Sequence, residues 1–253
     1  MKIVVDVGNT TTVLALVEGK QIKKTWRVET DVELSAPRLW ETWVGQVGLS
    51  VEHIDIFLVA SVVPKIDAKL VKIFKEKDDK ILWFLKYPWP SVLKIALEKP
   101  ETVGADRIAC ASALYFEYGS GIVVDFGTAT TVEAVEAGGR YCGGVIMPGV
   151  RATLAGLAEV TARLPRLSPE KPEEFSTRNT AAAMQSGIFY GLAGAVERAI
   201  EELRRKYELP ADCMVVATGG RGGDFLELCP SLRKEDEHLV LKGIMLSYEE
   251  KLG

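Results

Sequence analysis

Two short polar segments of this sequence carry the residue types needed to bind phosphate groups. They are Asp6-Val7-Gly8-Asn9-Thr10-Thr11-Thr12 and Asp125-Phe126-Gly127-Thr128-Ala129-Thr130-Thr131. In each, the aspartate can hold a cation, the glycine lets the backbone approach a ligand, and hydroxyl and amide groups can donate to phosphate oxygens. Such a set would catalyse phosphoryl transfer by positioning the reactants and stabilising charge.

Either segment taken alone also has a purely structural explanation, an Asx-type hairpin turn with no ligand. The presence of two copies favours the functional interpretation. Folding does not need a second Asp-x-Gly-Thr turn, whereas a nucleotide held from two sides does.

The two segments belong to an internal repeat. Residues 3–19 recur at residues 122–138, a constant offset of 119 positions (122 − 3), and 10 of the 17 aligned residues are identical. Agreement of this extent indicates two related halves. We therefore expect one domain over residues 1–118 and a second over residues 119–253.

The flanking elements follow an α/β pattern. Each repeat is typical of a β-hairpin, with strands over 2–7 and 11–17 in the first copy and over 121–126 and 130–135 in the second. We expect further strands over 54–61, 81–85 and 213–217, and helices over 37–47, 66–75, 105–118, 151–161 and 181–207. Gly143 and Gly144 suggest a turn, and the broad apolar face of the last helix indicates core packing or, alternatively, a subunit contact.

Composition excludes several classes of protein. The formal net charge is −4 with scattered basic residues, so no nucleic-acid partner is expected. No apolar run is long enough to cross a membrane, and we expect no membrane association and a cytoplasmic location. Four separated cysteines and two histidines argue against a zinc site or a disulfide framework.

Other nucleotide-binding motifs are absent. The sequence has neither a Gly-x4-Gly-Lys-[Ser/Thr] loop nor a Gly-x-Gly-x-x-Gly fingerprint. Asp125-Phe126-Gly127 matches the metal-binding triplet of protein kinases, but their His-Arg-Asp loop is missing. This match is accidental.

The motif set resembles the type III pantothenate kinase family, within the superfamily of acetate and sugar kinases, heat-shock chaperones and actin. The resemblance covers nearly the whole chain. It rests on both phosphate turns, on Gly104-Ala105-Asp106-Arg107, on the segment from Gly143 to Gly149, and on a Thr-Gly-Gly at residues 218–220. It implies two duplicated actin-like (ribonuclease H-like) α/β domains with the active site in the cleft between them.

The resemblance also implies a reaction, ATP-dependent phosphorylation of pantothenate, with Mg²⁺ accompanying ATP and a homodimer as the working form. Asp106 would be the general base, and Asp125 would hold a monovalent cation, K⁺ or NH₄⁺. Pantothenate would contact Gly104, Ala105, Asp106, Arg107 and Thr180. ATP would contact Asp6, Val7, Gly8, Asn9, Thr10, Thr11, Thr12, Val13 and Thr128.

Each of these residues has a structural alternative. An aspartate in the first turn of a helix is favoured by the helix dipole, which predicts a lowered pKa for Asp106. Arg107 could pair with a surface acid instead of the substrate carboxylate. Thr180 could be the N-cap of the long helix, and Thr218 with its glycines could be only a strand-to-helix turn.

One position departs from the family pattern. Relatives often carry a tyrosine three residues before the proline that precedes Gly104, and this chain has Leu97 there, so a tyrosine contact to pantothenate is not available. Two other functions share the fold: an accessory transcriptional regulator and a kinase acting on another small molecule. The presence of Asp6, Asp106 and Asp125 and the lack of a basic surface argue against the regulator.

Overall fold

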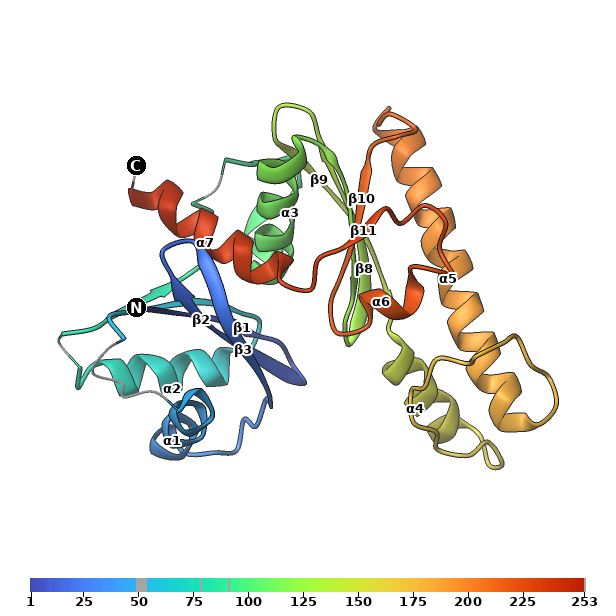
Figure 1. Ribbon diagram of the computed structural model, residues 1–253, viewed down its shortest axis with the longest axis horizontal. Helices are drawn as coiled ribbons and strands as arrows, with labels where there is room; N and C mark the ends of the chain where they lie inside the picture. The colour runs from blue at the N-terminus through green and yellow to red at the C-terminus, as the bar shows by residue number, and fades with distance from the viewer. Residues whose placement is uncertain (49–53, 78, 91, 253) are drawn as a thin grey trace. The chain divides into compact units, whose positions relative to one another are not determined.

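A computed structural model describes residues 1–48, 54–77, 79–90 and 92–252 of the chain. They form two compact units (Figure 1). The first contains Met1–Val92, Glu98–Ala113 and Leu239–Gly253, and the second contains Leu93–Leu97 and Leu114–His238. The boundary falls inside α3 (Ala105–Tyr118), and the C-terminal helix belongs to the first unit. Domain bounds of 1–118 and 119–253 stay a prediction.

The first unit is built on a five-stranded sheet of order β3-β2-β1-β4-β5. Its strands are β1 (Lys2–Val7), β2 (Thr11–Glu18), β3 (Gln21–Glu29), β4 (Ile56–Ser61) and β5 (Ile81–Phe84). Central β1 pairs antiparallel with β2 and parallel with β4. Because both faces of β1 are covered, its sequence is a nearly continuous apolar run.

Helices α1 (Ala36–Val47) and α2 (Pro64–Phe74) lie on the same side of this sheet (Figure 1). Their apolar residues join Ile3, Val5 and Val7 of β1 in one core. Helix α7 (Leu239–Leu252) also packs against β1 and β4. The carboxyl end of β1, where the first acidic turn begins, is therefore held by a rigid core.

The second unit is built on a six-stranded sheet of order β11-β10-β7-β8-β9-β6. Its strands are β6 (Lys94–Ile95), β7 (Gly121–Phe126), β8 (Ala129–Glu136), β9 (Arg140–Pro148), β10 (Met214–Thr218) and β11 (Lys234–Glu235). Strand β10 runs parallel to both β7 and β11. The unit also contains α4 (Val150–Val160), α5 (Thr180–Lys206) and α6 (Gly222–Phe225), while η2 (Pro100–Thr102) precedes α3 in the first unit.

Helix α5 runs along the second sheet (Figure 1) and contributes Ile188, Phe189 and Val196 to its core. In that core the rings of Phe126 and Phe225 stack with centroids 4.2 Å apart. The apolar face of α5 is thus explained by packing within its own unit.

The expected helices and strands are confirmed to within two residues at each end, and several elements were missed. Gly143 and Gly144 lie inside β9, so the predicted turn is wrong. Gly143 (φ +73°) sits at a register shift between β8 and β9, and a Cβ at Gly144 would overlap the carbonyl oxygen of Val132. Glycines at a β-bulge were mistaken for glycines in a turn.

Within the described ranges, no helix has the length and apolarity to cross a membrane. All four cysteines are buried, as expected for small apolar side chains.

Candidate active site

The first acidic turn joins β1 to β2. The amide of Gly8 donates a hydrogen bond to the carbonyl oxygen of Thr11 over 3.1 Å, and a Cβ at Gly8 would lie only 3.0 Å from that oxygen. The Thr30 amide donates to the Thr10 carbonyl at 3.0 Å, and Asn9 is exposed at the tip. The turn is therefore tight and keeps its tip accessible.

The register of this hairpin decides which hydroxyls share a face with Asp6. Val7 pairs with Thr12, so Thr12 lies on the core face, where it is buried and its hydroxyl is 2.8 Å from that of Thr30. Thr11 lies on the opposite face with half-buried Asp6. Of the two β2 threonines predicted to contact ATP, Thr11 shares the face of the carboxylate and Thr12 does not.

The second acidic turn joins β7 to β8. The amide of Gly127 donates to the carbonyl oxygen of Ala129 over 3.1 Å. Here Asp125 pairs with Thr131, so the half-buried Thr131 shares the face of the carboxylate. Thr130 is fully buried on the other face, and its hydroxyl has no hydrogen-bond partner among the described residues.

Backbone from two other segments crowds this second turn. Gly219, just after β10, has φ +85°, and a Cβ there would overlap the Asp125 carboxylate and lie 2.8 Å from the Phe126 carbonyl carbon. The amide of Gly149, which precedes α4, donates a hydrogen bond to the Thr128 carbonyl oxygen over 3.1 Å. A Cβ added at Gly149 would lie 2.7 Å from the same oxygen. Both positions require glycine because backbone approaches backbone.

The predicted general base lies at the start of α3. The Asp106 Oδ1 atom accepts a hydrogen bond from the Arg107 amide at 2.8 Å. A Cβ at Gly104 would overlap this oxygen and lie 3.4 Å from a methyl group of Val62. Glycine at 104 thus leaves the carboxylate space, and Val62 adds an apolar neighbour that the motif did not indicate.

The environment of Asp106 corrects one expectation. Burial raises the pKa of the Asp106 carboxyl above its ordinary value, and the Arg107 amide and guanidinium lower it by less. The Asp106 side chain is only half-buried, yet its desolvation makes the largest contribution to the shift of its pKa. The lowered pKa predicted from the helix dipole is wrong, because loss of water outweighs the helix N-terminus here.

Thr180 is exposed and is the first residue of α5. The N-cap is Asn179, whose Oδ1 atom accepts a hydrogen bond from the Ala182 amide at 2.9 Å. The N-cap interpretation of Thr180 is therefore wrong, and its hydroxyl is not needed to begin the helix.

Leu97, which stands where relatives often carry a tyrosine, packs against Gly143. A Cβ added at Gly143 would lie 2.8 Å from a methyl group of Leu97.

Asp125 is the residue that the family resemblance assigns to a monovalent cation. In the part of the chain that the structure describes, no three His, Cys, Asp or Glu side chains cluster as a metal site would require. Asp125 offers a single carboxylate, an oxygen donor that K⁺ and divalent cations both accept, so the identity of the cation stays a prediction.

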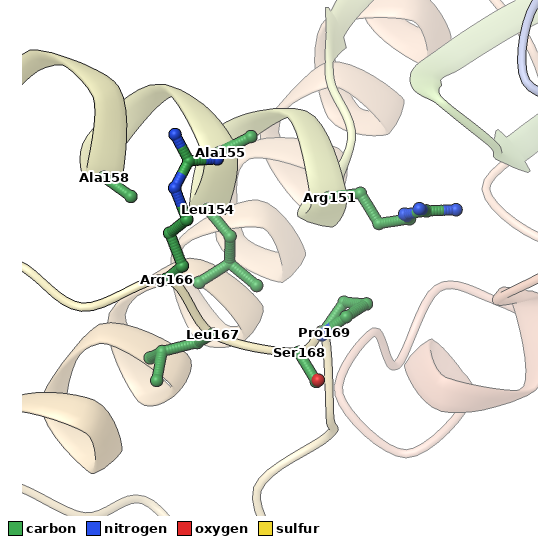
Figure 2. A pocket seen from close by; sticks show the side chains of 8 residues that line it. All are labelled: Arg151, Leu154, Ala155, Ala158, Arg166, Leu167, Ser168 and Pro169. Atoms are coloured by element: carbon green, nitrogen blue, oxygen red, sulfur yellow. The ribbon is translucent and has the colours of Figure 1, made fainter.

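A cavity of about 290 Å³ lies between α4 and the segment that follows it (Figure 2). Leu154 and Leu167 form its apolar part, and the guanidinium groups of Arg151 and Arg166 do not point toward one another. None of the predicted site residues lines it. We assign it no role in the chemistry.

Comparison with known structures identifies the fold. The chain matches a Baf family transcriptional activator from Campylobacter jejuni with TM-score 0.62 and 17% identity, over 99% of this chain and 98% of that one. It matches a ROK family glucokinase from Streptomyces griseus, solved with glucose and AMPPNP, with TM-score 0.55 and 12% identity, over 100% and 99% of the chains. Identities this low show the fold alone, and the predicted class of two actin-like α/β domains is confirmed, while an active site in the cleft between them stays a prediction.

Sequence comparison identifies the family. The family model described as type III pantothenate kinase matches residues 2–202. A type III pantothenate kinase from Brevibacillus brevis is 37% identical over 98% of both chains, and one from Paramagnetospirillum magneticum is 37% identical over 97% of this chain and 95% of its own. The acidic turns and the Gly-Ala-Asp-Arg helix start thus occur in a chain that belongs to the type III pantothenate kinase family.

Proposed function

We propose that this protein transfers the γ-phosphoryl group of ATP to the primary hydroxyl of pantothenate, the first step toward coenzyme A. The observation that carries the proposal is the match to type III pantothenate kinases over nearly the full chain, with Asp6, Asp106 and Asp125 all in place. A regulator without catalysis would have no need of all three carboxylates.

The nucleotide contacts are assigned to both turns. Residues 6–13 would contact ATP through the amides of the first turn and the Thr11 hydroxyl, and Thr128 would contact it from the second. The Thr12 hydroxyl, already bonded to Thr30, would support the turn instead. A monovalent cation held by Asp125, together with Mg²⁺ on the nucleotide, would supply charge neutralisation when bound.

The acceptor site is assigned to the start of α3. Gly104, Ala105 and Arg107 would line the pantothenate pocket, with the Arg107 guanidinium on the substrate carboxylate and Thr180 as a further contact. Asp106 would orient the reacting hydroxyl and accept its proton. Its raised pKa supports this role, because a more basic carboxylate accepts a proton more readily.

Asp106→Asn tests the assignment. Pantothenate-dependent ADP release should fall by at least ~100-fold, the range typical for loss of a general base. The asparagine side chain keeps the Oδ1 acceptor for the Arg107 amide, so folding should survive. Omitting either pantothenate or potassium from the wild-type assay should abolish activity. ADP release that does not depend on pantothenate would contradict the proposal.

The pH dependence gives a second test. Asp106 must be ionised to act as a base, so kcat/KM should fall as the pH drops through its pKa. Because burial raises that pKa, the acid limb should lie above 3.8, the ordinary aspartate value. Arg107→Met removes a cation that lowers the pKa, and it should move the limb to higher pH in a profile measured from about pH 4 to about pH 9. An unmoved limb would argue against Asp106 as the titrating group.

We also propose a homodimer acting in the cytoplasm, where ATP is available. Exposed aromatic side chains support a subunit contact on the second unit: Phe175 is 61% exposed and its ring centroid lies 5.2 Å from that of Tyr190, which is also exposed. Light scattering during gel filtration measures the mass directly. A stable monomer with full activity would rule the dimer out.

A further inference from the structure

One rung of the second sheet places a threonine on each side of Asp125. Thr218 of β10 and Thr131 of β8 are both in register with Asp125, which lies on the strand between them. Residues in register on neighbouring strands point to the same face of a sheet, and successive residues of one strand alternate between faces. Ala217, the residue before Thr218, belongs to the core that α5 covers. Thr218 therefore lies on the opposite face, with the Asp125 carboxylate.

The Thr218 hydroxyl is buried and lacks a partner. The residue is 0% exposed, and among the residues that the structure describes its Oγ1 atom has no hydrogen-bond partner. A buried hydroxyl in this state costs free energy unless a bound group satisfies it. Strand propensity does not explain a threonine here, because valine has the same shape and no polar atom to satisfy. The hydroxyl thus indicates a bound group on this face.

The Asp125 carboxylate lies close to the strand end that carries Thr218. A Cβ at Gly219, the next residue, would overlap Asp125 Oδ1, and a Cβ at Gly127 would lie 3.5 Å from the same atom. Neighbouring strands are about 4.8 Å apart, so the carboxylate and the hydroxyl share one small space at this rung. Asp125 is half-buried, whereas Thr218 is enclosed. A single ion on the carboxylate needs less room to contact the hydroxyl than a phosphate group does.

We propose that the Thr218 hydroxyl is a second oxygen ligand of the cation that Asp125 holds, an inference that rests on the cation role of Asp125 in the proposed function. Hard cations take oxygen ligands, and threonine or serine hydroxyls serve as such ligands in other phosphoryl-transfer enzymes. A lone pair of the hydroxyl faces the ion while its proton stays in place. The half-buried Thr131, on the other side of Asp125, stays available to phosphate.

Urea unfolding of the full chain tests this assignment without measuring activity. KCl is titrated in the presence of ADP, with choline chloride at equal concentration as the reference. Because a ligand that binds only the folded state stabilises it, KCl should raise the urea midpoint of the wild type. Thr218→Val and Thr218→Ala should each need ~10-fold more KCl for half of that increase, the factor for one contact to a charged group. Thr218→Ser keeps the hydroxyl and should respond as the wild type does.

Thr130→Val is the matched control. It also removes a fully buried hydroxyl that has no partner among the described residues, but from the core face of the sheet. Its response to KCl should equal that of the wild type. An equal loss in this variant would show that the effect does not depend on the face of the sheet, and it would overturn the inference.

The remaining outcomes separate this inference from the proposed function. A wild-type response to KCl in the Thr218→Val and Thr218→Ala variants would overturn the inference, and so would a wild type that does not respond to KCl. In both cases pantothenate-dependent ADP release by the wild type would leave the proposed function in place. A KCl response that requires the Thr218 hydroxyl, in a protein without pantothenate-dependent ADP release, would support the inference and overturn the function alone.

Discussion

The two acidic hairpins share 10 of 17 aligned residues, yet their strands pair in different registers. In the first, Asp6 is opposite Val13, and in the second, Asp125 is opposite Thr131 instead of Val132, the sequence equivalent of Val13. A shift of one residue turns every side chain of the second strand to the other face.

The shift reassigns the threonines. Thr12 and Thr130 are the buried pair, although they are not equivalent in the aligned sequences, and Thr11 and Thr131 are the half-buried pair on the aspartate face. Each hairpin thus presents one threonine beside its carboxylate, taken from a different position of the repeat. A repeat can thus preserve a chemical arrangement while the register of its strands changes.

The hairpins also differ in how closely other backbone approaches them, and this difference predicts the largest mutational effect. Gly219→Ala would place a methyl group against the Asp125 carboxylate at a positive φ. We expect a loss of ~100-fold in kcat/KM, since displacement of a ligand group by about 1 Å costs this much. In Gly8→Ala the added methyl group would lie 3.0 Å from one carbonyl oxygen, and we expect kcat/KM to fall by less than ~10-fold. Equal losses of kcat/KM in the two variants, measured by coupled ADP assays, would show that the two turns do not differ in how closely other backbone approaches them.

The register predicts a smaller effect at the threonines. Thr131→Val removes the hydroxyl on the Asp125 face and should lower kcat/KM by ~10-fold, the factor for one hydrogen bond to a charged phosphate. Thr130→Val should leave activity near wild type because that side chain faces the core. A reversed order would mean that the sequence alignment, and not the register, identifies the functional hydroxyl.

The smallest expected effect concerns stability. Thr130→Val removes a buried hydroxyl without a partner and should raise the free energy of unfolding by about 1 kcal/mol. Thr12→Val breaks the hydrogen bond to Thr30 and should lower it by about 1 kcal/mol. Urea unfolding monitored by circular dichroism measures both. Changes of the same sign would show that the two buried threonines are not in different environments.

Much of the fold followed from the sequence. The hairpins, the helix over residues 105–118 and the strand before Thr218 have clear periodicity and glycine boundaries, and they were predicted correctly. Helix α7 was missed because residues such as Leu239, Ile244 and Tyr248 bury several of its sides, which leaves no amphipathic pattern. The edge strand β3 was missed because its side chains are mostly half-buried or exposed.

The site was predictable in its residue types and less so in their arrangement. The motifs indicated Asp6, Asp106 and Asp125. They did not indicate that Gly149 and Gly219 contact the second turn, because these contacts join segments far apart in the chain. The pKa of Asp106 could not be predicted either, since the position in the helix is visible in the sequence and the degree of burial is not.

Asp6→Asn and Asp125→Asn test whether each acidic hairpin is needed for phosphoryl transfer from ATP. Coupled ADP release, with and without pantothenate, should fall by at least ~100-fold in each variant, in line with loss of a group that stabilises the transferring phosphoryl. Circular dichroism should show both variants folded. If either variant consumed ATP at the wild-type rate in the presence of pantothenate, the account would be contradicted.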